Sequence, residues 1–256
     1  MLTKCLNANL DLDILRLPRF TNPWHYEKTK SANIALYLAQ LYPRNPTSDI
    51  ATKDPRMVQK VWRREFPAGH GLEKALAAAR NPSQPHPISD PPSELGELAN
   101  ADVGGEGFTL SSFTAHDAVE LGHLLYARLL PFTAAQGRPA LISICGAGGA
   151  QVLFQMATGP GTTPDNESWV RRKRAAALRF GVSSWYLGRK HRGDEAAFAA
   201  KFGLGPSEAG QYAIHGGAVP IRVEGVEGVV GVVVVSGLKQ GEDHGVIAEV
   251  IRENWE

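Results

Sequence analysis

The spacing of hydrophobic positions along residues 93–256 predicts alternating groups of helices and strands. After Thr114, which can cap a helix, apolar residues including Leu121 and Leu125 share one face and predict a helix over 115–130. A valine-rich run predicts a buried strand over 229–236. The same reasoning predicts helices at 93–101, 164–180, 184–190, 195–202 and 242–253, and strands at 138–145, 151–156 and 218–223. Helices before, between and after two strand pairs are typical of an α+β fold.

Residues 1–92 differ in composition from the rest of the chain. They hold most of the prolines, almost none of the glycines and an excess of basic residues. The proline-rich stretch near 81–93 predicts an extended linker. Three short helices are predicted before it, at 32–41, 56–64 and 71–80. We interpret residues 1–92 as a partly ordered N-terminal extension and linker, and 93–256 as the main domain; an independent N-terminal domain is the alternative.

Composition excludes several classes of protein. Of the 256 residues, 43% are hydrophobic and 21% charged, which is enough apolar material for a folded core. The net charge of +1 argues against a dedicated nucleic-acid-binding protein. Cys5 and Cys145 are too few for a disulfide framework and form no zinc pattern. The longest apolar run, 228–238, is too short to span a bilayer. We expect a soluble, cytoplasmic protein with neither nucleic acid nor membrane as a partner.

The segment His215-Gly216-Gly217 is the first candidate site. Two glycines after a histidine leave backbone N–H groups uncovered beside an imidazole, an arrangement that can hold an anion, a carbonyl oxygen or a metal. The same residues can equally form a structural turn into the strand at 218–223, with glycine supplying positive φ. Spacing alone leaves both interpretations open.

Lys173 and His244 are two further candidates. Lys173 shares the apolar stripe of the 164–180 helix with Trp169, so it either extends to solvent or meets a carboxylate or an anionic ligand. Asp243 and His244 follow the valine strand at its turn into the last helix. They either belong to a site at the sheet edge or, for Asp243, complement the helix dipole.

Several motifs in register resemble the UPF0303 family, a branch of the haem-binding, haem-degrading-like superfamily that includes the GlcG and HbpS types. They cover about residues 93–256, whereas we recognise no family resemblance in residues 1–92. The motifs are FT at 113–114, DAVELG at 117–122, GTTPDN at 161–166, WVRRK at 169–173, RFGVSS at 179–184, HGGAVPIRV at 215–223, VSGL at 235–238 and EDH at 242–244.

The resemblance implies a profilin-like α+β fold, with an antiparallel sheet flanked by helices, and assembly into homo-oligomers. It also implies a small-molecule ligand such as a tetrapyrrole, with haem as the candidate cofactor and no cofactor as the alternative. His215 is then the first candidate for an axial ligand or acid–base group and His244 the second, and Lys173 with Arg172 would pair with carboxylates. The candidate catalytic residues are His215, Lys173 and His244. The candidate binding residues are Asp165, Asn166, Trp169, Arg172, Lys173, His215, Gly216 and Gly217.

Three functions follow as hypotheses. The first is a small-molecule-binding protein of the haem-binding type, acting on a tetrapyrrole or a similar carboxylate-bearing ligand. The second is a cofactor-free cyclase, lyase or isomerase, including a pericyclic type of cyclisation, on an apolar metabolite of a biosynthetic pathway. The third is a non-catalytic oligomeric adaptor that binds a protein partner through residues 1–92.

Overall fold

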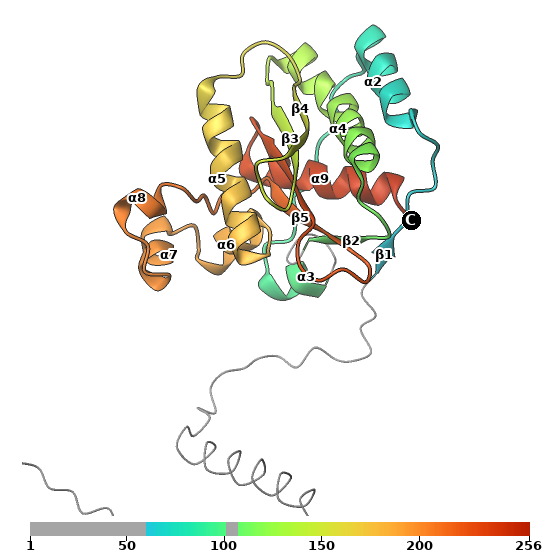
Figure 1. The fold of residues 1–256 in the computed structure, drawn as a ribbon. Coiled ribbons are helices and arrows are strands. Elements are labelled where there is room, and N and C mark those ends of the chain that lie inside the picture. Colours follow the sequence, from blue (N-terminus) through green and yellow to red (C-terminus); the bar gives the residue numbers. More distant parts are fainter. Residues whose placement is uncertain (1–59, 101–106) are drawn as a thin grey trace, which may run out of the picture. The chain divides into compact units, whose positions relative to one another are not determined.

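Six strands form one mixed sheet in the computed structural model, which describes residues 60–100 and 107–256 (Figure 1). The spatial order is β1-β2-β5-β6-β3-β4. β5, β6, β3 and β4 pair antiparallel, as the α+β prediction requires, whereas β1 and β2 add parallel strands beside β5. The strands are β1 (Val61–Trp62), β2 (Phe108–Leu110), β3 (Leu141–Gly146), β4 (Val152–Ala157), β5 (Ala218–Val223) and β6 (Gly231–Ser236).

Helices cover both faces of this sheet. α4 (Ala115–Gln136) and α9 (Gln240–Asn254) pack on one face, and α5 (Pro164–Phe180) packs on the other (Figure 1). Successive side chains of β6 point to opposite faces of the sheet. Val233 and Val235 therefore belong to the core under α4 and α9, while Val232 and Val234 pack with α5. The remaining described helices are α2 (His70–Arg80), α3 (Leu95–Asn100), α6 (Ser184–Lys190), α7 (Glu195–Lys201) and α8 (Pro206–Ala209). None of the described helices is long and apolar enough to cross a membrane.

Most predicted elements of the main domain are confirmed, and the differences have local causes. α4 continues through Pro131 to Gln136, because the last turn buries Phe132 and ends in a left-handed Gly137. The prediction of a helix at 56–64 is wrong for residues 60–64, the part that the structure describes, because these residues contain β1. The helix predicted at 32–41 lies outside the described residues. The patterns also missed β2 and α8, which are too short to show a period.

Residues 60–92 pack against the main domain. Trp62 and Ile88 belong to the same core as the strands, and the Trp62 ring contacts Phe108 edge-on at 5.7 Å between ring centroids. α2 lies on α4, where the Glu120 carboxylate accepts a hydrogen bond from the backbone N–H of Gly71 at 2.6 Å. This part of the N-terminal segment therefore supplies one strand, one helix and buried side chains to the fold.

The position of Trp62 generates a stability prediction. Its side chain is only 7% exposed, so Trp62→Ala should lower the free energy of unfolding by about 3–5 kcal/mol. Leu72→Ala on α2 is the matched control, because Leu72 is 46% exposed and should change stability little. Urea unfolding followed by circular dichroism measures both. Equal stability of the two variants would contradict a structural role for β1.

Candidate functional site

Lys173 forms a buried ion pair with Asp243 between α5 and α9. Its Nζ donates to Oδ2 of Asp243 at 2.9 Å and to the carbonyl oxygen of Val235 in β6 at 3.2 Å. The side chains are 5% and 3% exposed. Oδ1 of Asp243 accepts from the N–H of Leu238 at 2.9 Å. Burial raises the pKa of Asp243, an effect that the Lys173 charge partly opposes. Of the alternatives open for Lys173, it thus meets a carboxylate in the interior.

The second glycine of the His-Gly-Gly motif packs directly on this ion pair. Gly217 has a φ of 118°, and a β-carbon there would lie 2.8 Å from Nζ of Lys173. Gly216 is equally close to its neighbours, since its β-carbon would lie 2.8 Å from the ring of Trp185. Both positions therefore need glycine for close packing, and this packing holds the chain beside His215.

His215 lies where this glycine turn reaches the surface. Its side chain is 38% exposed, its ring stands edge-on to Trp169 at 5.1 Å, and its Nε2 is 3.3 Å from Oε1 of Glu195. Arg172 lies over the Trp169 ring at 4.7 Å and has its Nη2 3.6 Å from the same oxygen. We call these four residues, Trp169, Arg172, Glu195 and His215, the His215 cluster. Of its members, the sequence reasoning missed Glu195, whose place in a short helix after Asp194 gave no chemical signal.

A small cavity lies beside Arg172 and Glu195. Its volume is about 140 Å³, and its wall includes Phe198, Tyr212 and Ile214. Arg172 holds its position there by donating from Nη2 to the carbonyl oxygen of Tyr212 at 3.0 Å. Pockets for whole small molecules usually measure about 300–1,000 Å³. This cavity therefore has room for one polar group or one edge of a ligand.

The other predicted site residues lie in different surroundings. His244 is fully buried in α9, with its ring stacked on Trp185 at 6.1 Å. Asn166 caps α5, where its Oδ1 accepts from the N–H of Thr163 at 2.8 Å and its Nδ2 donates to the carbonyl oxygen of Ser236 at 3.2 Å. Asp165 is exposed in the same helical turn. The fold therefore brings His215, Trp169 and Arg172 together at the surface, and it buries Lys173 and His244.

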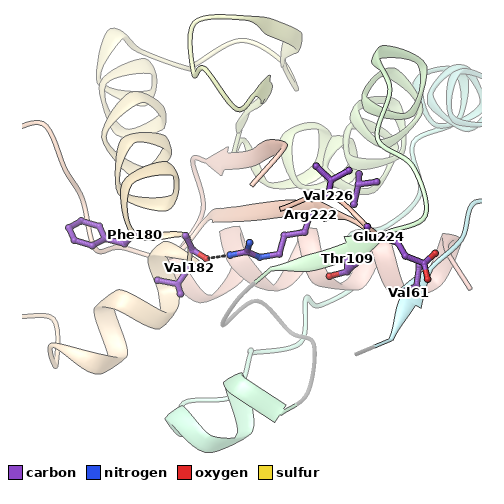
Figure 2. A pocket seen from close by; sticks show the side chains of 10 residues that line it. Val61, Thr109, Phe180, Val182, Arg222, Glu224 and Val226 are labelled. Atoms are coloured by element: carbon purple, nitrogen blue, oxygen red, sulfur yellow. Dashed lines mark hydrogen bonds between the residues drawn. The ribbon is translucent and has the colours of Figure 1, made fainter. Parts of the chain in front are cut away.

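A larger hollow opens at the other end of α5 (Figure 2). Its volume is about 570 Å³, and it holds the side chain of Arg222 from β5, whose Nη2 donates to the carbonyl oxygen of Gly181 at 2.9 Å. The sequence analysis did not select Arg222. The available signal was a charged residue inside an otherwise apolar strand. The described lining residues are Val61, Thr109, Phe180, Gly181, Val182, Arg222, Val223, Glu224, Gly225 and Val226.

The residues that the structure describes form no metal-binding cluster of their own. Within 60–100 and 107–256, no group of three or more histidine, cysteine, aspartate or glutamate side chains could hold a metal ion. Cys145 is buried, and burial raises the pKa of its thiol. The chemistry offered by the His215 cluster is therefore that of one imidazole, one guanidinium, one carboxylate and an indole.

The buried ion pair predicts a measurable coupling free energy between Lys173 and Asp243. Removing one partner of a buried ion pair usually costs about 3–5 kcal/mol, because the other charge stays buried. Asp243→Leu and Lys173→Met should each lower stability strongly, and the double variant should lose much less than the sum of the two. Urea unfolding of all four proteins measures the coupling. The exposed pair Arg63–Glu224 is the control and should show almost none; strict additivity at Lys173–Asp243 would contradict the assignment.

Comparisons with known proteins agree with this fold. The family model described as "Haem degrading protein HbpS-like" matches residues 113–252. A UPF0303 protein of Streptomyces avermitilis is 43% identical over 145 residues, which is 57% of this chain and 82% of that protein. The UPF0303 protein YBR137W of Saccharomyces cerevisiae is 41% identical over 135 residues, covering 53% of this chain and 71% of that protein. The crystal structure of Ybr137w shares 34% identity with a TM-score of 0.54, over 63% of this chain and 87% of that one. The protein therefore belongs to the UPF0303 family and carries an HbpS-like domain.

Proposed function

We propose that the domain binds a small carboxylate-bearing molecule of the haem or tetrapyrrole class at the His215 cluster. The observation that carries this proposal is a solvent-accessible imidazole with an indole and a guanidinium beside it. Membership of the HbpS-like family, whose description names haem degradation, supports the ligand class. The ligand would be held at one edge by the cluster.

His215 and Glu195 suit the task of ligating haem iron. A histidine that binds a metal usually donates its other ring N–H to a carboxylate, which fixes the tautomer and the ring orientation. The approach of Nε2 of His215 to Glu195, at 3.3 Å, matches that arrangement, and Nδ1 would then be the nitrogen available to hold iron. Haem needs only one or two such protein ligands, so a lone surface imidazole is sufficient. When bound, the iron would supply redox chemistry, and these residues would orient it.

Arg172 and Trp169 suit the rest of such a ligand. A guanidinium is always charged and pairs with carboxylates through its planar fork of N–H groups. Trp169 offers an apolar ring next to the imidazole. Because the adjoining cavity measures about 140 Å³, it would take one carboxylate edge and leave the rest of a tetrapyrrole outside it. The outer part of the ligand would then be open to a second copy of the chain, as the homo-oligomer hypothesis expects.

A haemin titration of the full-length protein tests the proposal. We expect a sharp, saturable Soret band at one haem per chain, or per pair of chains if the ligand lies between copies. His215→Ala should shift the band and weaken binding by at least about tenfold, because the iron loses its protein nitrogen. His116→Ala on α4 is the control, because this histidine is exposed and lies outside the cluster. A broad, non-saturating rise, or an identical titration of His215→Ala, would contradict the proposal.

Glu195 generates a second prediction at this site. Glu195→Gln keeps the size of the side chain but removes the charge that faces His215, so the imidazole becomes a weaker donor to iron. We expect haemin affinity to fall by about tenfold or more while the Soret band stays saturable. Glu208→Gln in α8 is the matched control, because Glu208 is exposed and caps its own short helix. Unchanged affinity in Glu195→Gln would remove Glu195 from the positioning role.

A further inference from the structure

β4 is the last strand of the sheet, and one of its edges has no described strand beside it. The strand order gives β4 a single described neighbour, β3, with which it pairs antiparallel (Figure 1). At the opposite end of the sheet β1 has only two residues, whereas β4 has six. An edge strand presents backbone N–H and C=O groups with which another extended chain can pair. β4 is therefore the longer of the two edges at which this sheet could be extended.

This edge has none of the charges that usually protect such strands. Residues 139–164 contain β3, β4 and the loops on either side of β4, and they include no lysine, arginine, aspartate, glutamate or histidine. The run is 26 residues long, and no other stretch of the chain without Lys, Arg, Asp or Glu exceeds 13 residues. Natural edge strands are commonly protected by charged side chains, lysine above all, because these oppose pairing with a second strand. An identical strand would meet no like charge here.

The side chains of β4 are neutral and largely exposed. Val152 is 49% exposed and Met156 is 38% exposed, and Gln155 and Ala157 are exposed as well. A carboxylate reaches the strand from α5, since Oε2 of Glu167 accepts a hydrogen bond from Nε2 of Gln155 at 3.1 Å. This contact lies on the face of the sheet that α5 covers. The edge itself thus offers backbone groups flanked by uncharged side chains.

The pairing with β3 determines which backbone groups of β4 point outward. The N–H of Thr158, directly after β4, donates to the carbonyl oxygen of Ala140 at 2.9 Å. Backbone groups of successive strand residues point to opposite edges, so those of Met156 also face β3, while those of Gln155 and Ala157 face outward. Toward the start of β4 a bulge interrupts the register with β3. The regular part of the outer edge therefore consists of Gln155 and Ala157.

We propose that β4 pairs antiparallel with β4 of a second copy of this chain, across a twofold axis at Met156. Gln155 of each copy would exchange backbone hydrogen bonds with Ala157 of the other, and the two six-stranded sheets would become one continuous sheet. Only this register pairs both outward residues with each other. A shift in either direction would place one of them opposite the bulge or the loop after β4.

The side chains at this pairing suit an identical partner. Two Met156 side chains would face each other on the axis, and methionine is unbranched and adapts its shape to its neighbours. Ala157, which would lie opposite Gln155, adds little bulk. Like charges directly opposite each other destabilise a strand pair, and residues 139–164 contain none. No residue of the His215 cluster lies in this run, so the interface is independent of the site proposed for haem.

Cysteine cross-linking of the full-length protein tests the geometry, in a Cys5→Ser background and without haemin. Met156→Cys should give a disulfide-linked dimer on mild oxidation, because facing residues of this kind have Cα atoms about 4.5 Å apart, within the disulfide range of about 4.4–6.8 Å. Val226→Cys, which changes a 51% exposed residue between β5 and β6, is the control and should not cross-link efficiently. Cys145 is buried and should not contribute. Adding His215→Ala to Met156→Cys should leave the cross-link intact, which distinguishes this interface from one bridged by haem.

A matched pair of variants at Ala157 tests the backbone pairing by sedimentation equilibrium. Ala157→Pro removes an outward N–H without removing a hydrogen bond to β3, so it should weaken association by at least about tenfold. Ala157→Ser keeps the N–H and should associate like the unaltered protein, and circular dichroism checks that both variants fold. Unaltered protein that stays monomeric at micromolar concentrations would overturn the proposal. So would equal association of two folded Ala157 variants, or a Met156→Cys variant that cross-links no better than Val226→Cys.

Discussion

The buried ion pair between Lys173 and Asp243 is the interaction on which the arrangement of the site depends. It joins α5 and α9 and also uses a carbonyl oxygen of β6, so three elements from both faces of the sheet meet at one ammonium group. Taking both charges out of water is costly, and the hydrogen bonds to Val235 and Leu238 offset part of that cost. Gly217 lies against the pair without a side chain, which sets the path of the backbone that carries His215.

One helix consequently has two roles. On α5, Lys173 points into the interior, whereas Trp169 and Arg172, four and one residues before it, reach the His215 cluster. The far end of the same helix leads into the segment whose carbonyl oxygen holds Arg222. Any rotation of α5 would therefore disturb the cluster and the hollow together. The two surroundings remain chemically different, because the cluster presents an imidazole with its carboxylate and the hollow holds a guanidinium among valines.

The sequence predictions were accurate where a feature depends on neighbouring residues, and they failed where it depends on residues far apart in the chain. Thr114 precedes α4 as expected, because caps and helical periodicity act within a few residues. Thr163 and Ser183 occupy the same position before α5 and α6. β1 and β2 were missed since each is very short, and they are held by partners far along the chain. The alternatives for Lys173 could not be resolved from spacing, because Asp243 lies 70 residues away and reaches it only through the fold.

By itself, the sequence determined the α+β class, most helices and strands of the main domain, and the motifs that resemble one family. These properties depend on local periodicity, capping and residue identity. Only the tertiary structure decided that His215 is accessible while His244 is buried, that Glu195 joins the cluster, and that Arg222 lies in a hollow. The exposure and contacts of a side chain depend on which distant segments pack together. The pattern of residues along a single strand or helix does not specify this packing.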